Sequence, residues 1–320
     1  MAKPIESVRI GIDVSKAELV IARSDSKNLE TIANTSSAIR RWLKTLPCGP
    51  QLAFEATGAY HRTLAALAHQ AGCELYLLDG YRLNRYREGV GNRAKTDPAD
   101  ARLILRYLSK ELSDLKPWVP PHDAFYRIQS LLRRRASLVQ TRVALTQSLG
   151  DVPELKSVGK RLNKTIAGVE KLIERRLKEA MAEVGWQPDA QRCKAIEGIG
   201  DLTSIALANI FHRGEFKNSD AFIAYLGMDV RVRDSGKHIG RRKLTKKGDP
   251  ELRRLLYNAA MSASRTKAWA GQYETYLGQG LKTTQALVKL ARKLARIAFA
   301  LMKNQAMYRP KMPITGCAAP

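Results

Sequence analysis

The chain lacks the features that mark several protein classes. Its four cysteines are scattered, with no C-x-x-C pair and no histidine at zinc-ligand spacing; they are Cys48, Cys73, Cys193 and Cys317. This argues against a disulfide framework and a structural zinc site and favours reduced thiols. No apolar run is long enough to cross a bilayer, and the opening MAKPIESVRIGID has no hydrophobic stretch of the signal-peptide kind. We therefore expect a cytoplasmic protein without a membrane partner.

Negative charge is also scarce. Lysine and arginine number 55 against 30 aspartates and glutamates, which gives a net charge of +25 and a pI near 10.1. Because membrane-binding features are missing, this excess predicts nucleic acid as the polyanionic partner. The net charge is +5 over residues 1–112, +5 over 113–190 and +15 over 191–320. The C-terminal segment is thus predicted to hold the polyanion, while the first segment has acids to spare.

Residues 1–112 predict an α/β domain. Two β-branched runs, Ser7–Val14 and Ala17–Ser24, are joined tightly and indicate a hairpin. Further strands are predicted in LETIAN, QLAFEA and CELYLLD, and amphipathic helices in SAIRRWLKTL and AYHRTLAALAHQAG. A hairpin followed by alternating helices and strands is the order of an RNase-H-like mixed sheet with flanking helices.

The rest of the chain is predicted to be mainly helical. Three prolines in SDLKPWVPPHDAF (113–125) mark a linker, and residues 113–190 then predict a long helical arm broken near Gly150 and Pro153. Such an arm is typical of a coiled-coil-like contact in a homo-oligomer, a dimer or tetramer, and an ordinary bundle is the alternative. Residues 191–320 form the predicted C-terminal domain.

A helix–hairpin–helix-like element is predicted in CKAIEGIGDLTSIALANI (193–210). There Gly198 and Gly200 would let backbone N–H groups approach a phosphate at the start of the following helix. The alternative is a connection between helices that is capped by glycine.

Two aspartates three residues apart, Asp97 and Asp100, stand in TDPAD within this basic chain. Taken alone they indicate a helix start, with Pro98 in the first turn and acids that complement the helix dipole. Two further acids, Asp13 and Glu55, follow apolar strands, where burial of an unpaired charge is costly.

If these four carboxylates converged, they would repel one another unless divalent cations neutralised them. Oxygen ligands without histidine favour Mg²⁺ or Mn²⁺. Two such ions about 3.5–4 Å apart are a common device for activating a phosphodiester. The acids therefore favour a metal-dependent enzyme that acts on nucleic acid. Lys95 and Arg102 would either contact the phosphate backbone or balance the charge of the acids.

A serine lies near the start of a strongly basic segment, RVRDSGKHIGRRKLTKKGDPELRRLLYNAAM (231–261). In DSG, Ser235 is typical of a hairpin turn. The cations around it could instead bind phosphate and stabilise the charge of a phosphoryl-transfer transition state. Those cations are Arg231, Arg233, Lys237, Arg241, Arg242, Lys243, Lys246 and Lys247. Because a serine hydroxyl is a poor nucleophile without activation and no adjacent base is evident, both interpretations stay open.

Together, GIDVSK, FEATGAY and AKTDPADAR resemble the DEDD signature of the IS110 family of insertion-sequence transposases, which includes the pilin-gene invertase Piv. The resemblance continues in GIG, FIAYLGM, DSGK and RRKLTKKGDPELRRLLYNAAM. It implies an N-terminal domain similar to the resolvase RuvC, with Asp13, Glu55, Asp97 and Asp100 as catalytic metal ligands. It also implies Ser235 as a covalent nucleophile, element ends and target DNA as substrates, and guidance by a structured bridge RNA.

Three other functions were weighed. A tyrosine recombinase would use the H-x-x-R pattern of His238–Arg241 with Tyr257, Tyr273 or Tyr276, but it leaves the four acids unexplained. A RuvC-like endonuclease would hydrolyse DNA without a covalent intermediate. A basic protein that binds nucleic acid without catalysing a reaction would account for the charge. In such a protein, however, Asp13 and Glu55 would destabilise the fold without a compensating role.

Overall fold

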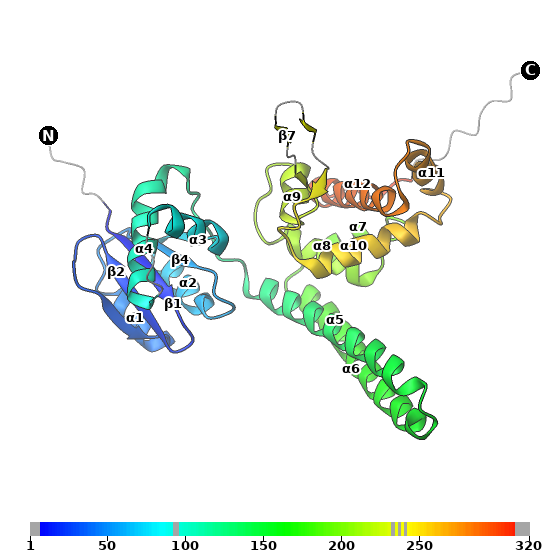
Figure 1. Ribbon diagram of the computed structural model, residues 1–320, viewed down its shortest axis with the longest axis horizontal. Coiled ribbons are helices and arrows are strands. Elements are labelled where there is room, and N and C mark those ends of the chain that lie inside the picture. The colour runs from blue at the N-terminus through cyan, green and yellow to red at the C-terminus, as the bar shows by residue number, and fades with distance from the viewer. Residues whose placement is uncertain (1–6, 92–95, 232–233, 236–237, 240–241, 311–320) are drawn as a thin grey trace, which may run out of the picture. The chain divides into compact units, whose positions relative to one another are not determined.

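The computed structural model describes residues 7–91, 96–231, 234–235, 238–239 and 242–310. Its contacts divide the chain into two compact units, residues 1–120 and 121–320 (Figure 1). The first unit carries the mixed sheet with its helices, and the second is almost entirely helical. This is the predicted fold class, an α/β segment followed by a mainly helical one.

The N-terminal sheet has five strands in the order β3-β2-β1-β4-β5. The pairs β1–β2 and β2–β3 are antiparallel, and β1–β4 and β4–β5 are parallel, so the predicted hairpin is confirmed. The strand bounds are Arg9–Val14 for β1, Glu18–Arg23 for β2, Glu30–Ala33 for β3, Gln51–Glu55 for β4 and Glu74–Leu78 for β5. The two central strands, β1 and β4, are nearly continuous apolar runs because both of their faces are covered.

Helices cover the two faces of this sheet. Helices α1 (Ser36–Leu43) and α2 (His61–Gln70) share one hydrophobic cluster with Ile10, Ile12 and Phe54. Helices α3 (Gly80–Gly89) and α4 (Asp97–Glu111) pack over residues of the opposite face. Because side chains alternate along a strand, Gly11, Asp13 and Glu55 point toward the face that α3 and α4 cover.

Helix α4 approaches β1 closely at Gly11. A Cβ atom added there would lie 2.3 Å from the backbone nitrogen of Leu105 and 2.5 Å from the carbonyl oxygen of Ala101. No side chain fits between the strand and the helix at this point. The missing side chain of Gly11 therefore allows α4 to rest directly on the strand that carries Asp13.

In the second unit, α5 (Asp123–Gly150) and α6 (Lys156–Glu183) form a long helical hairpin, joined through a short 3-10 turn at Pro153–Leu155 (Figure 1). Their base enters the C-terminal core through Phe125, Ile128 and Leu177. Farther out the contacts are more polar: Glu170 is 7% exposed and accepts a hydrogen bond of 2.9 Å from Arg142. Because α5 ends at Gly150 and the turn begins at Pro153, the break predicted near these two residues is present.

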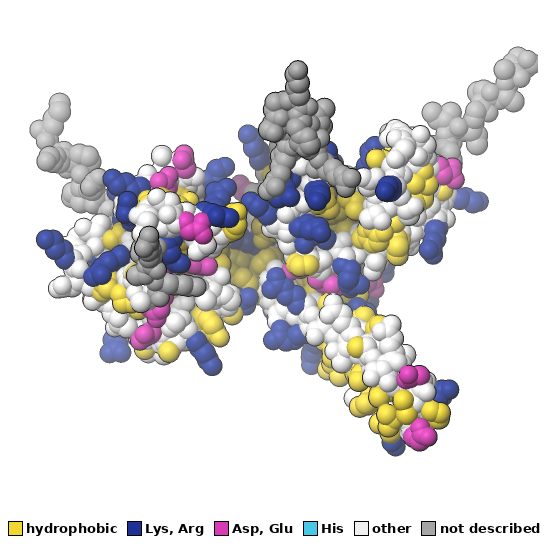
Figure 2. Space-filling view, viewed as in Figure 1, with side chains coloured by type: hydrophobic (Ala, Val, Ile, Leu, Met, Phe, Trp, Pro, Cys, Tyr) yellow, Lys and Arg dark blue, Asp and Glu magenta, His cyan; other side chains and the backbone are white. Residues whose placement is uncertain are grey.

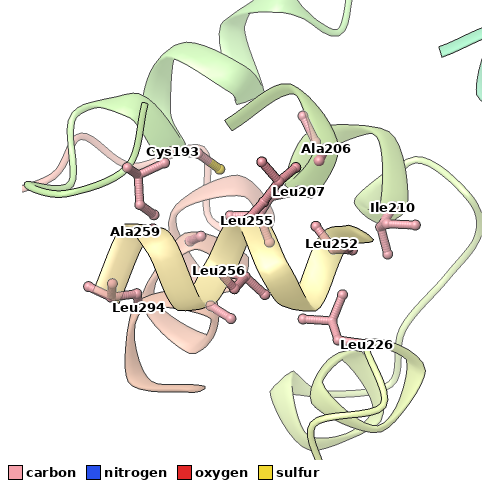
Figure 3. Packing of buried hydrophobic residues seen from close by; sticks show 14 of the residues in the cluster. Cys193, Ala206, Leu207, Ile210, Leu226, Leu252, Leu255, Leu256, Ala259 and Leu294 are labelled. Carbon is pink, nitrogen blue, oxygen red and sulfur yellow. The ribbon is translucent and has the colours of Figure 1, made fainter. Parts of the chain in front are cut away.

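The core of the second unit surrounds helix α10 (Pro250–Ala263). Figure 3 shows Leu252, Leu255, Leu256 and Ala259 of α10 among residues of the neighbouring helices. Those neighbours are α7 (Gln187–Lys194), α8 (Asp201–Phe211), α9 (Ser219–Tyr225) and α12 (Thr283–Lys303), and α11 (Ala270–Gly278) packs on α12. Between α9 and α10 the chain makes four two-residue strands: β6 (Val230–Arg231), β7 (Asp234–Ser235), β8 (His238–Ile239) and β9 (Lys243–Leu244).

Among the described residues, none of the helices is both long enough and apolar enough to span a membrane.

Gly11→Ala should destabilise the N-terminal unit strongly, because the added methyl group would overlap the backbone of α4. A loss of about 2–4 kcal/mol is expected, in the range of overpacked cores with backbone displacement. Thermal unfolding of the full chain measures it. The control is Gly89→Ala at the exposed end of α3, where a Cβ would meet nothing within 4 Å. Equal unfolding temperatures for the two variants would contradict the close packing at Gly11.

Candidate active site

Asp13 and Glu55 lie at the carboxyl ends of the adjacent parallel strands β1 and β4. In the register of this pair Ile12 is opposite Phe54, so the next residues along the strands, Asp13 and Glu55, are neighbours on the same face. In open α/β sheets, ligands bind at the carboxyl ends of the strands. The sheet thus places two of the predicted acids at an edge suited to a site.

Helix α4 brings the other two acids to this edge. It begins at Asp97 after the extended residue Thr96, with Pro98 in its first turn. Thr96 makes no side-chain cap, and Asp97 and Asp100 are the two acids of the first turn. The predicted helix start is therefore present. Because the helix rests on Gly11, its first turn extends toward Asp13, two residues farther along the strand.

The four carboxylates lie within each other's electric field. The pKa of Asp13 is raised from 3.8 to about 6, mainly because burial removes water from the carboxylate. The charges of Asp97, Asp100 and Glu55 raise it further, in that order, and a backbone hydrogen bond at Val14 opposes them. The fold has thus concentrated negative charge around a half-buried acid.

Two residues that the sequence analysis did not identify shape this site. Arg87 of α3 pairs with Asp100, with 2.8 Å between Nη2 and Oδ1, and the two side chains are only 14% and 16% exposed. The Nε of Arg87 is buried and has no hydrogen-bond partner within the described part of the chain. Gly80 begins α3 beside the carboxylate of Glu55, since a Cβ there would lie 2.2 Å from Oε1. A carboxylate so near a helix N-terminus is favoured by the helix dipole.

The sequence predicts two cations, Lys95 and Arg102, near these acids. Arg102 is exposed on α4, and Lys95 lies outside the described residues. The cation that pairs with an acid of the site is instead Arg87. The spacing of charges in the sequence gives no signal for this, because the contact joins the last turn of α3 to the first turn of α4.

The site offers carboxylate oxygens, the donors that Mg²⁺ and Mn²⁺ prefer. In the ranges that the structure describes, no group of three or more His, Cys, Asp or Glu side chains is arranged to hold a metal ion. Asp100 is turned to Arg87 instead. The donor chemistry and the uncompensated charge on Asp13 nevertheless fit a divalent cation, because such an ion would relieve the repulsion that raises the pKa of Asp13.

Ser235 belongs to the second unit. Its backbone lies in β7 and pairs with His238 of β8, so Ser235 belongs to a strand, whereas the sequence predicted it within the hairpin turn. The described cations of this region are all exposed and consist of Arg231, Arg242, Lys243, Lys246 and Lys247. The other predicted contacts, Arg233, Lys237 and Arg241, lie outside the described residues. Figure 2 shows dark-blue side chains gathered around this part of the helical unit.

Gly198 and Gly200 lie between α7 and α8, as predicted, but Gly198 has a packing role. Its φ is +92°, and a Cβ there would lie 2.6 Å from Ala259 O and from Ala263 of α10. Gly200 is exposed and precedes the first turn of α8. That turn carries Asp201, which forms ion pairs with Lys178 and Lys194. An acid at this helix start disfavours a second anion there, and phosphate binding by the two glycines stays a prediction.

Comparison with known proteins gives matches over both units. Residues 10–152 match the DEDD transposase model for IS110, described as "Transposase", and residues 190–274 match a model described as "Transposase IS116/IS110/IS902 family". A "Pilin gene-inverting protein" of Moraxella lacunata is 26% identical over 79% of this chain and 80% of its own length. A "Probable family 20 transposase" of Pseudomonas aeruginosa is 32% identical over 49% of this chain, which spans about half (46%) of that protein's length.

A third relative, the "Transposase for insertion sequence element IS1111A" of Coxiella burnetii, is 27% identical over 52% of this chain and 47% of its own length.

Asp13→Asn should raise the unfolding temperature at pH 7.5 in the absence of divalent ions. Ionising Asp13 in the folded state is opposed, since its pKa is about 6 there against 3.8 in the unfolded chain. The stabilisation by the amide is therefore full above about pH 6 and disappears below pH 4. After allowance for screening by solvent, about 1 kcal/mol is expected.

The measurement is thermal unfolding with a chelator between pH 4 and 8. Asp114→Asn, which changes an exposed acid of the same unit, serves as the control. A gain for Asp13→Asn that stays constant from pH 4 to pH 8 would show that the gain does not come from ionisation.

Proposed function

Because the chain belongs to the IS110 family of insertion-sequence transposases, we propose that it cleaves and exchanges DNA strands at the ends of its element and at a target. The relative named for pilin-gene inversion supports DNA recombination as the reaction class. The observation that carries the proposal is the gathering of Asp13, Glu55, Asp97 and Asp100 on one face of the N-terminal sheet.

The acidic site is proposed to hold divalent cations. Asp13, Glu55, Asp97 and Asp100 would supply the oxygen ligands. Bound Mg²⁺ or Mn²⁺ would supply electrostatic stabilisation of the charge that develops on the scissile phosphate. Oδ1 of Asp100 accepts from Arg87, so the guanidinium of Arg87 would lie beside the bound ion. An arginine there can donate to a phosphate oxygen, and its unpartnered Nε provides a donor.

Ser235 is proposed as the nucleophile. Its Oγ forms an ester bond with the phosphorus atom while the bond from phosphorus to one sugar oxygen breaks, and the serine proton passes, in net terms, to that oxygen. The hydroxyl of another strand then attacks the phosphoserine and returns the proton to Ser235. Because an ester is conserved in both steps, strands can be rejoined without an external energy source. The exposed cations Arg231 and Lys243 can stabilise the added charge.

A structured guide RNA and self-association complete the proposal. The net charge of +25, of which +15 lies in residues 191–320, is sufficient for contacts with both DNA and RNA. The similarity to the family supports RNA guidance, and the long α5–α6 hairpin supports a homo-oligomer, a dimer or tetramer. Target choice would then lie in the RNA.

Loss of either proposed centre should abolish recombination. With DNA carrying the ends of the element, its RNA and Mg²⁺, we expect strand exchange to fall at least about 10³-fold in Asp13→Ala and Ser235→Ala, as for essential catalytic groups. A covalent protein–DNA adduct should form with wild-type protein and map to Ser235 by mass spectrometry. Tyr257→Phe is the control and should keep its activity.

Three outcomes would oppose this proposal in different ways. A covalent adduct that maps to a tyrosine would show that the nucleophile is a tyrosine and not Ser235. Cleavage that survives Ser235→Ala would indicate hydrolysis by water, as in a RuvC-like endonuclease. Absence of any cleavage by wild-type protein with its own element's DNA and RNA would favour a binding protein.

Divalent cations should stabilise the N-terminal unit. Because Mg²⁺ or Mn²⁺ would bind the folded carboxylates and not the unfolded chain, the unfolding temperature of wild-type protein should rise with metal concentration. The rise should be much smaller in Asp13→Asn and Glu55→Gln, and unchanged in Asp114→Asn. The readout is thermal unfolding without DNA, so it does not depend on catalysis. An equal rise in all four proteins would contradict metal binding at these acids.

A further inference from the structure

The short strands that carry Ser235 cannot fix their own position. Strands β6 and β9 share two residue pairs, as do β7 and β8, and β7 and β8 stand away from the helices α9 and α10 (Figure 1). A two-stranded ribbon of this size is marginally stable by itself. The direction in which it presents Ser235 must therefore be set where it joins the helical domain. We call that junction, residues 226–229 and 245–249, the ribbon base.

The two chain segments of the ribbon base touch through their backbones. Gly227 ends α9 with a φ of +65°, and a Cβ there would lie 2.4 Å from the nitrogen of Gly248. A Cβ on Gly248 would in turn lie 2.4 Å from the carbonyl carbon of Leu226. Both positions therefore require glycine, and the two segments leave no room for a side chain between them.

Hydrogen bonds also join the two segments of the ribbon base. The amide of Thr245 donates to the Asp229 carbonyl at 3.0 Å, and the amide of Lys246 donates to the Gly227 carbonyl at 3.1 Å. The hydroxyl of Thr245 also donates to the carboxylate of Asp229. Lys246 has a φ of +58°, an uncommon conformation for a residue with a side chain, so these contacts hold the backbone in a strained turn.

Arg253 of α10 contacts both segments of the ribbon base. Its Nη1 donates to the carbonyl of Gly248 at 2.7 Å and reaches the carbonyl of Leu226 at 3.5 Å. The same nitrogen lies 2.9 Å from the place that a Cβ of Gly227 would occupy. The guanidinium is half-buried and contacts the base at the point where its two segments meet.

Asp249 fixes the helix that carries Arg253. Its Oδ1 accepts from the amide of Glu251 and caps α10. Its Oδ2 accepts from the Nε and Nη2 of Arg133 on α5, at 3.1 and 2.8 Å. Helices α5 and α10 are thus connected at Asp249, the last residue of the ribbon base, so the helix that carries Arg253 is held in place.

From this geometry we propose that Arg253 is a positioning residue for the Ser235 ribbon. By bridging the carbonyls of Leu226 and Gly248 it holds the base closed and sets the direction in which β7 presents the serine. It does not touch DNA or the reacting atoms. This role rests on the proposed nucleophilic function of Ser235.

The test compares Arg253→Met with Arg254→Met. Arg254 is the next residue of the same helix, and its guanidinium pairs with Glu251 within α10. Both variants remove one positive charge, but only the first removes a bridge to the ribbon base. Circular dichroism and thermal unfolding of the full chain establish that both are folded. Arg253→Lys is a third variant that keeps a donor for the Gly248 carbonyl.

The first readout is hydrogen exchange of the Thr245 and Lys246 amides, measured without DNA. We expect exchange at least about tenfold faster in Arg253→Met and within about twofold of wild type in Arg254→Met, because local opening sets the exchange rate. Unchanged amide exchange in Arg253→Met would show that Arg253 does not hold the ribbon base closed, which overturns the proposal. This readout needs no catalysis, so it tests whether Arg253 holds the ribbon base closed even if the proposed function is wrong. The proposed function is tested separately, by whether wild-type protein forms an adduct on Ser235.

The second readout is formation of the Ser235–DNA adduct at saturating DNA. The rate should fall about 30- to 100-fold in Arg253→Met with the DNA dissociation constant unchanged, since a displacement of the nucleophile by about 1 Å has effects of this size. Arg254→Met should react at the wild-type rate, and Arg253→Lys should recover most of the loss. Normal adduct formation despite faster exchange overturns the positioning role. So does a rate recovered by raising the DNA concentration, which would show that Arg253 contributes to binding alone.

Discussion

The close contact between α4 and β1 at Gly11 determines where the acids of the N-terminal unit lie. Because no side chain separates the helix from the strand, the first turn of α4 is held above Asp13. The parallel register of β1 and β4 adds Glu55 from the side. Acids from three separate segments thereby lie near one another, and the charges of the other three add to the burial that mainly raises the pKa of Asp13.

The two units differ in where their charged side chains lie. The N-terminal unit concentrates carboxylates at one strand edge, where the largely buried guanidinium of Arg87 pairs with Asp100. The second unit has exposed cations around the ribbon and uses others for internal order, as Arg133, Arg142 and Arg253 do. A basic residue in this chain therefore cannot be assigned to nucleic-acid binding from its charge alone, since several have acceptors within the fold.

The sequence predicts the strands, the helices and the fold class well, because alternating and helical hydrophobic patterns are local properties. It also draws attention to the four acids that the fold brings together, because Asp13 and Glu55 end buried strands and Asp97 and Asp100 stand in a motif that resembles a family signature. It does not identify Arg87, Gly11 or Gly80, whose roles come from contacts between elements that no periodic pattern records. For Gly198 the local pattern suggests an approach to phosphate, whereas the structure gives a packing reason that depends on α10, about 60 residues later in the chain.

The crowded acids have a consequence for the evolution of such elements. Neutralising Asp13 relieves the cost of ionising a half-buried acid, so under the proposed function a copy that loses this acid by mutation would lose its reaction without losing its structure. Selection for folding alone would therefore favour inactive copies. Under the proposed function, such copies would accumulate as well-folded proteins that keep the basic surface of the second unit and compete with active ones for nucleic acid. The cost of ionising Asp13 would thus connect one site in the fold to the loss of active copies from a population of insertion elements.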